Sequence, residues 1–420
     1  MRSEEREFRF SLLTRRFSLL ASRSSLLTYP GLREIPRGVW ALGFVSLFMD
    51  ISSEMIHGLL PVFLITVLGA STEVVGLIEG VGEATASVSK LGSGWLSDKL
   101  GKRKALTVLG YGLGAVSKPL FAIAPTAFVV LGARFSDRVG KGIRGAPRDA
   151  MIGEMVQAGQ RGASYGLRQA LDSVGAFTGP LLAIVLMAVL HDNFRLIFWL
   201  AVIPGGISVL ILMIAVREPQ NAGPVRRAAI ELRDLKAIGG GYWLVAGIGV
   251  VLTLARFSEA FLILRAQNAG LSLALAPLVL VVMNIVYSLS AYPLGWLSDR
   301  IDRRLMLAAG FATLIAADVV LAAAPNLAIV MIGVALWGLH MGMTQGLLSA
   351  VVADESPAHL RATAFGVFNF ASGFALLLAS LVAGVLWEQI GPAATFIAGA
   401  VFTAVGLSIL FVTRGMRTVA

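Results

Sequence analysis

The stretch GWLSDKLGKRK, residues 94–104, decides the fold because its first five letters return about two hundred positions later. The second copy, GWLSDRIDRR, occupies residues 295–304. In each copy an apolar segment that begins with glycine is followed by an aspartate and then by a cluster of cations. A phrase repeated at this distance indicates that the chain contains two similar halves.

The composition is unusually apolar. Of the 420 residues, 56% are hydrophobic and only 14% are charged, and the mean hydropathy is +0.79. Soluble proteins contain about 25% charged residues. Twelve apolar stretches reach about the ~20 residues that a helix needs to cross a bilayer. We place them at residues 40–66, 73–96, 105–123, 127–148, 164–189, 195–216, 242–264, 273–296, 305–323, 326–351, 363–387 and 393–413. The sequence therefore predicts an all-α integral membrane protein with twelve transmembrane helices.

The net charge of +10 is unevenly distributed between the apolar stretches. If the N-terminus is cytoplasmic, nearly all loop cations are cytoplasmic, and the opposite loops contain only Arg195 and Arg265. This asymmetry follows the positive-inside rule and predicts a bacterial inner (plasma) membrane protein with both termini in the cytoplasm. It also explains the basic composition without a nucleic-acid partner. The chain has no cysteine, which excludes disulfides and thiolate metal sites.

Four regions can be distinguished along the chain. Residues 1–38 form a basic tail, residues 39–216 contain six apolar stretches, residues 217–240 form a polar cytoplasmic linker, and residues 241–420 contain the other six stretches. The tail is interpreted as a disordered or membrane-surface segment or as an over-long gene start, with a regulatory arm as the alternative.

The two halves match at a nearly constant offset. Besides the repeated phrase, Ala124 and Pro125 correspond to Ala324 and Pro325. Duplicated six-helix units are typical of secondary transporters, whose substrate site lies near mid-membrane at the interface between the repeats.

The phrase at residues 94–104 resembles, almost letter for letter, the loop motif G-x-L-x-D-r-x-G-r-[KR]-[KR] of the major facilitator superfamily. The copy at residues 295–304 is similar, with Asp302 in place of the second glycine. Arg134 and Gly140 fit the family's fourth-helix pattern R-x-x-x-G-x-G, whereas Arg138 replaces its first glycine. The resemblance covers residues 39–415, and the segment FMDISSEMIHGLLPVFL is similar to a little-characterised prokaryotic branch. It implies two pseudo-symmetric six-helix bundles that rock to alternate access to a central site.

Two interpretations of the repeated phrase remain open. A glycine lets another helix approach closely, and an aspartate at the membrane edge can face a helix N-terminus or pair with arginine. The phrase would then be a gate latch, made of Gly94, Asp98, Arg103, Gly295, Asp299 and Arg303. The alternative is a tight turn whose charges only fix the topology.

The fifth stretch contains a second motif. Its residues Gly166, Gly175, Gly179 and Pro180 match the pattern G-x8-G-x3-G-P that proton antiporters of this family carry, although the usual trailing glycine pair is absent. The alternative is that these small residues serve only helix packing.

Ionisable residues inside a membrane usually mark a transport pathway. Asp50 and Glu54 lie near mid-membrane and, at a spacing of four, share one helix face. A carboxylate in apolar surroundings binds a proton more readily, and a nearby arginine reverses this effect. Because the resemblance implies such a device, we expect proton coupling by Asp50, Glu54, Glu83 and Arg134. The alternatives are fixed ion pairs with Arg134 or Arg138 and a direct substrate or cation site.

A further set of polar residues is expected in the substrate cavity: His57, Arg138, Arg168, Asp172, Glu259, Asn284, His340, Gln345 and Asn369. Arg168 and Asp172, spaced i,i+4, are favoured as a structural pair over a relay. For Glu259, ion pairing and a functional role remain equal alternatives. For His340, a place in the cavity wall is favoured over metal ligation with Met343.

We expect a secondary active transporter and not an enzyme, because no GxxxxGK[ST], HExxH or GxSxG motif is present. The favoured function is proton-driven antiport that exports a small amphipathic solute, such as a drug or metabolite. The alternatives are uptake of an organic anion or a chelated metal, lipid translocation, and a non-transporting receptor. We expect a monomer driven by the proton gradient, with no cofactor, bound metal or nucleic-acid partner.

Overall fold

The computed structural model describes residues 35–100, 102–156, 161–218, 239–298, 301–355 and 361–412. These residues are almost entirely helical and contain no strand. The first half forms α2 (Arg37–His57), α3 (Leu60–Thr66), α4 (Thr72–Leu100), α5 (Arg103–Ile123), α6 (Ala127–Met155), α7 (Arg161–Val189) and α8 (Phe194–Ala215). The second half forms α10 (Gly240–Ala255), α11 (Ala260–Asn268), the short 3-10 helix η4 (Leu273–Leu275), α12 (Leu278–Ser298), α13 (Arg303–Ala323), α14 (Leu327–Asp354), α15 (Arg361–Gln389) and α16 (Pro392–Val412).

These helices coincide with the predicted apolar stretches and confirm the all-α fold. The first stretch is divided into α2 and α3, and the seventh into α10 and α11. Pro61 in the first turn of α3 accounts for the first break, because proline has no N–H for the helical ladder. At the second break the N–H of Ser258 donates to Ser380 Oγ of α15 at 3.2 Å, so a neighbouring helix satisfies the freed backbone group.

Ten helical segments of the described chain are long and apolar enough to cross a membrane. The two long helices outside this set are α4 and α6, which carry charged residues along much of their length. They pack against each other, so their charges face the protein interior.

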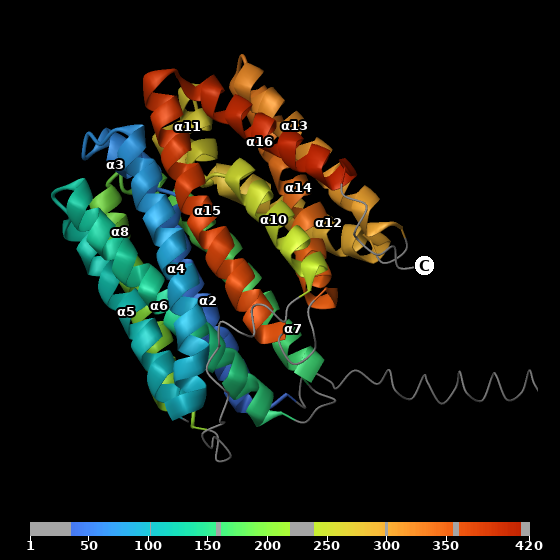
Figure 1. The fold of residues 1–420 in the computed structure, drawn as a ribbon. Helices are drawn as coiled ribbons and strands as arrows, with labels where there is room; N and C mark the ends of the chain where they lie inside the picture. The colour runs from blue at the N-terminus through green and yellow to red at the C-terminus, as the bar shows by residue number, and fades with distance from the viewer. Residues whose placement is uncertain are drawn as a thin grey trace, which may run out of the picture.

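The helices form two groups that lie side by side (Figure 1). In the first group α2 packs on α7 and α8, while α6 packs on α4 and α5. In the second group α14 packs on α12 and α13, and α10 packs on α15 and α16. The most extensive contact between the groups joins α4 to α15.

This α4–α15 contact is tight from one end of the molecule to about its middle, where a Cβ atom at Gly373 would collide with the side chain of Ser87. A Cβ atom at Gly76 would collide with the carbonyl of Ser380, and one at Gly384 would lie 2.8 Å from the carbonyl oxygen of Thr72. The Thr72 hydroxyl donates to Glu388 Oε2 at 2.6 Å across the same contact. We call the end that contains Thr72 the Thr72 end and the opposite end, where α2 begins, the Arg37 end; the two groups are therefore joined at the Thr72 end.

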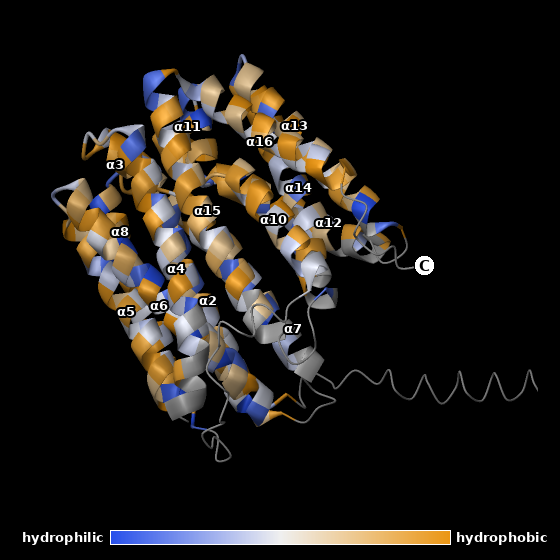
Figure 2. Ribbon diagram, in the orientation of Figure 1, coloured by the Kyte–Doolittle hydropathy of each residue, from blue (hydrophilic) through white to orange (hydrophobic). Residues whose placement is uncertain are grey.

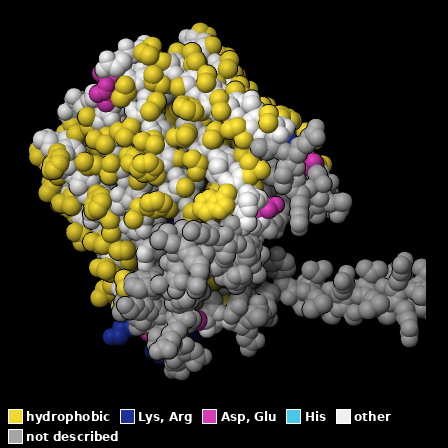
Figure 3. Space-filling model, viewed as in Figure 1, with side chains coloured by type: hydrophobic (Ala, Val, Ile, Leu, Met, Phe, Trp, Pro, Cys, Tyr) yellow, Lys and Arg dark blue, Asp and Glu magenta, His cyan; other side chains and the backbone are white. Residues whose placement is uncertain are grey.

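The outer surface is apolar. Large side chains such as Phe128, Ile214 and Val401 are exposed on helix faces that point away from the interior. Figure 2 shows hydrophobic residues along most helices, and the face seen in Figure 3 is dominated by hydrophobic side chains, with few charges. Exposed apolar surface of this extent is suited to lipid. The protein is a multi-pass membrane protein.

Candidate functional site

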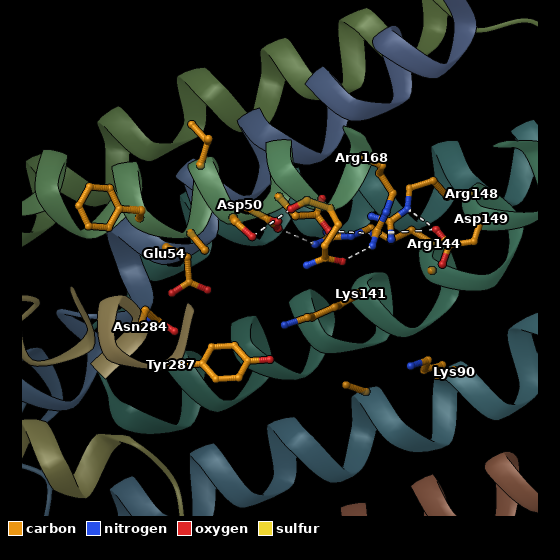
Figure 4. A pocket seen from close by; sticks show the side chains of 18 of the residues that line it. Asp50, Glu54, Lys90, Lys141, Arg144, Arg148, Asp149, Arg168, Asn284 and Tyr287 are labelled. Atoms are coloured by element: carbon orange, nitrogen blue, oxygen red, sulfur yellow. Dashed lines mark hydrogen bonds and ion pairs between the residues drawn. The ribbon is translucent and has the colours of Figure 1, made fainter. Parts of the chain in front are cut away.

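A cavity of about 1110 Å³ lies between α2, α4, α6 and α7 of the first group and α12 and α15 of the second. It extends from Glu54, near the middle of the molecule, toward the Arg37 end, where Lys90 and Gln169 are exposed. Figure 4 shows charged side chains pointing into it. All its charged lining residues come from the first group: Asp50, Glu54, Glu83, Lys90, Lys141, Arg144, Arg148, Asp149, Arg168 and Asp172. The second group contributes neutral polar residues: Asn284, Tyr287, Ser288 and Asn369.

The carboxylates of α2 are positioned by the glycines of α7. A Cβ atom at Gly175 would lie 3.0 Å from the Cβ of Asp50, and one at Gly179 would lie 2.7 Å from the Cβ of Glu54. Pro180 is buried next to Gly179. The two glycines therefore allow α7 to lie directly against the face of α2 that carries both carboxylates.

Every carboxylate in the cavity wall has a basic partner. Arg168 Nη1 lies 2.7 Å from Asp172 Oδ2, and Arg148 Nε lies 3.0 Å from Asp149 Oδ1. The other three pairs are Glu83 with Arg138 at 3.1 Å, Glu54 with His57 at 3.4 Å, and Asp50 with Arg144 at 3.8 Å. The predicted Arg168–Asp172 pair is thus formed.

A second layer of charges is buried behind the cavity, between α2, α4, α5 and α6. Arg134 Nη2 donates to Glu79 Oε2 at 2.6 Å, and both side chains are almost fully buried. Lys118 Nζ donates to Asp137 Oδ1 at 2.7 Å. His57 connects the layers, because its Nε2 lies 3.7 Å from Glu79 Oε2 while its Nδ1 faces Glu54 in the cavity wall.

The proposed switch partner Arg134 is therefore paired with Glu79 and is not within ion-pair distance of Asp50 or Glu54. Sequence reasoning did not include Glu79 or Arg144 among the site residues. The signal for Glu79 was present, since it shares one stripe of its helix with Glu83.

The residues predicted for the substrate cavity separate into two sets. Those that line the cavity are Arg168, Asp172, Asn284 and Asn369. Those outside its lining are His57, Arg138, Glu259, His340 and Gln345. His340 is fully buried and its Nδ1 donates to the carbonyl oxygen of Gly310 at 2.8 Å, so its ring is held between α14 and α13. Glu259 is the N-cap of α11, and no ion pair of the described residues joins it to Arg256.

Much of the repeated phrase lies beyond the described structure. Gly94 and Asp98 belong to the last turns of α4 and Gly295 to α12, but their surroundings are not described, and Asp299 lies outside the described residues. Arg303 begins α13, but its side chain is not among the described parts of the structure. The same holds for the surroundings of Gly166 in α7. The tail through residue 34 and residues 219–238 of the linker are also outside it.

Arg103 is a member of the phrase that forms contacts in the described structure, as does its neighbour Lys104, whose backbone N–H donates to Glu218 Oε2 at 2.9 Å. Arg103 Nη1 lies 2.6 Å from Glu154 Oε1 at the end of α6, and the Arg103 backbone N–H donates to Glu218 Oε1 at 2.7 Å. Arg103 therefore joins the start of α5 to the Arg37 ends of α6 and α8.

Comparisons with known proteins agree with this architecture. The profile of the Major Facilitator Superfamily matches residues 42–264 and residues 242–418. An uncharacterized MFS-type transporter of Methanocaldococcus jannaschii is 32% identical over 387 residues, which cover 90% of this chain and 96% of that protein.

Two solved structures share the fold. A POT family transporter superposes with a TM-score of 0.77 at 12% identity, over 92% of this chain and 97% of that one. A bacterial homologue of the human lysosomal transporter Spinster, in an inward-facing and unoccupied conformation, superposes with a TM-score of 0.71 at 15% identity, over 89% of this chain and 95% of that one. The sequence matches and the shared fold show that this chain belongs to the Major Facilitator Superfamily of membrane transporters.

Proposed function

We propose that the protein is a proton-coupled antiporter that exports a small amphipathic solute by alternating access. The observation that carries this proposal is the position of Asp50 and Glu54. Both line a cavity that extends to one end of the molecule, and both are held against the antiporter-like glycines of α7. A change in the protonation of either carboxylate therefore acts directly on a helix contact.

The orientation is proposed from charge. The connections at the Arg37 end contain nearly all of the loop cations, which favours placing this end in the cytoplasm. Both termini would then be cytoplasmic, in the inner membrane, and the cavity would open inward. A transporter that exports a solute collects it from such an inward-open cavity.

Protonation of Asp50 would remove its charge and release Arg144, which weakens an attraction between α2 and α6. Protonation of Glu54 would release His57, which also faces Glu79 of α4. Both events change contacts of α2 with its neighbours. Proton binding would in this way favour one conformation of the first group over the other.

The cavity wall suits an amphipathic solute of drug-like size, because such sites typically have volumes of about 300–1,000 Å³. Phe177, Leu289 and Ile285 provide apolar surface beside the charged and amide groups. The proposal needs no cofactor besides the proton gradient, and a monomer suffices because one chain forms the whole cavity.

The test uses everted membrane vesicles with an acid interior, whose pH gradient is followed with acridine orange. Addition of an exported solute should dissipate the gradient, because protons leave as the solute enters. The double variant Asp50→Asn, Glu54→Gln should abolish this response while remaining folded. Asp192→Asn, in an exposed turn at the Thr72 end, is the matched control and should respond as the unaltered protein does.

Antiport would be overturned if solute moved in the same direction as an imposed proton gradient. That outcome would favour uptake instead. An unchanged response of the double variant would remove both carboxylates from the coupling mechanism.

A further inference from the structure

The charged side chains of the cavity wall are not all in ion pairs. Each of the five lining carboxylates has an arginine or histidine within 4.0 Å. Lys90 and Lys141 also line the cavity, but neither forms an ion pair or a side-chain hydrogen bond with the described residues. Among the charged side chains that line the cavity, the two without an ion-pair partner in the described part of the chain are therefore both cations.

The two lysines are placed to reach a ligand. Lys90 projects from α4 and Lys141 from α6, and both are exposed within the cavity. In Figure 4 the Lys141 ammonium and the Tyr287 hydroxyl point toward the same part of the cavity, with Asn284 and Glu54 beyond them. A lysine ammonium has three donors and no acceptor, so its preferred partner is an anionic oxygen.

The opposite wall has a different chemistry. Its polar residues Asn284, Tyr287, Ser288 and Asn369 are neutral, and α12 adds the apolar side chains of Ile285 and Leu289. Because the described part of this wall presents no carboxylate to the cavity, it does not repel a negative ligand. It offers hydrogen bonds and apolar contact to the rest of the molecule.

We propose that the transported solute is an amphipathic organic anion whose carboxylate or phosphate group binds Lys141, while Lys90, nearer the Arg37 end, adds a second positive charge to the cavity. Its apolar body lies against Phe177 and Leu289, and its neutral polar atoms meet Asn284 and Tyr287. This inference rests on the proposed function in taking the cavity as the transport cavity, and it does not depend on the direction of transport.

The ligand class is tested by equilibrium binding to the purified full chain in phosphatidylcholine nanodiscs. The probes are naphthaleneacetate, naphthyl phosphate, the neutral naphthaleneacetamide and the cationic naphthalenemethylammonium, which share one ring system. We expect the anions to bind about tenfold more tightly than the amide, as one charge-assisted contact allows.

Variants assign this preference to the lysines. Lys141→Gln and Lys90→Gln should each weaken anion binding several-fold and leave amide binding unchanged, whereas Lys141→Arg should retain the preference. Arg37→Gln, which removes a positive charge outside the cavity lining, is the matched control. Gel filtration and thermal unfolding show whether each variant is folded.

The proposal is overturned if neither anionic probe binds more tightly than the amide, or if the preference survives in the Lys90→Gln, Lys141→Gln double variant. Nanodiscs that contain phosphatidylglycerol distinguish the source of the anion. Displacement of naphthyl phosphate by this lipid would support the same site with a lipid headgroup as the ligand.

Failure of this proposal and failure of the proposed function are separable, because the binding assay uses no gradient. Anion-selective binding without proton exchange in vesicles would contradict antiport alone. Proton exchange driven equally by the amide and the anion would contradict the anion proposal alone.

Discussion

His57 is the residue that connects the cavity wall to the buried charge layer. Its two ring nitrogens face carboxylates on different helices, at 3.4 Å from Glu54 and 3.7 Å from Glu79. An imidazole in this position can pass a proton between two acids, and glutamine cannot. We predict that His57→Gln keeps ligand binding in nanodiscs but slows proton exchange in vesicles by about a hundredfold, the lower range for a positioned acid–base group. Proton exchange at the normal rate would limit His57 to a structural role.

At the same scale, charge partners can be predicted from the sequence only within one helix. The Arg168–Asp172 contact follows from the i,i+4 spacing. Arg144 and Asp50 are 94 positions apart along the chain and lie on different helices. Their contact therefore depends on how α6 is rotated and tilted against α2. Spacing in the sequence does not define that rotation, and for this reason the partner expected for Asp50 was Arg134.

At the scale of elements, helix ends are well predicted where charge clusters and prolines mark them. The break between α2 and α3 is signalled by Pro61, but residues 256–259 contain neither proline nor glycine. At that second break the hydrogen bond to Ser380 satisfies a freed backbone N–H, a tertiary contact that residues 256–259 do not signal. The duplication also predicts positions in the cavity wall. Asn284 lies 201 positions after the cavity residue Glu83, and Asn369 lies 200 positions after the cavity residue Gln169.

The contact of α7 with α2 gives a prediction for an element. At Gly179 an added Cβ would lie 2.9 Å from the carbonyl oxygen of Ile51 as well as close to Glu54, so one helix must move. Gly179→Ala should lower stability by about 1–3 kcal/mol, as overpacking does, and reduce transport. Gly206→Ala is the matched control, because no atom lies within 4 Å of its added Cβ. Thermal unfolding and vesicle transport compare the two; equal behaviour would mean that the glycines of α7 are not required for close packing.

At the scale of the whole molecule, alternating access requires the groups to separate at the Thr72 end. Gln389 Nε2 of α15 donates to Glu73 Oε1 of α4 at 3.1 Å, so the two positions are adjacent across that contact. The chain has no native cysteine. A bismaleimide that joins Glu73→Cys to Gln389→Cys should therefore stop transport while naphthaleneacetate still binds from the Arg37 end. The two single-cysteine variants, treated identically, should transport normally. Full transport by the cross-linked protein would mean that this contact does not open.

The two proposals together determine the charge moved in one transport cycle. A proton that enters and a monovalent anion that leaves each move one positive charge inward, so both steps are driven by an inside-negative membrane potential. Such a potential contributes about 2.3 kcal/mol per charge for every ~100 mV. In proteoliposomes without a pH gradient, a potential set by potassium and valinomycin should therefore drive the export of naphthaleneacetate. The driving energy per cycle should be about twice that for the exchange of a neutral solute with a proton, because two charges move instead of one. A symporter of the same anion and one proton would move no net charge. Transport that responds to the pH gradient but not to the potential would therefore contradict antiport, while the proposed anion site would be unaffected.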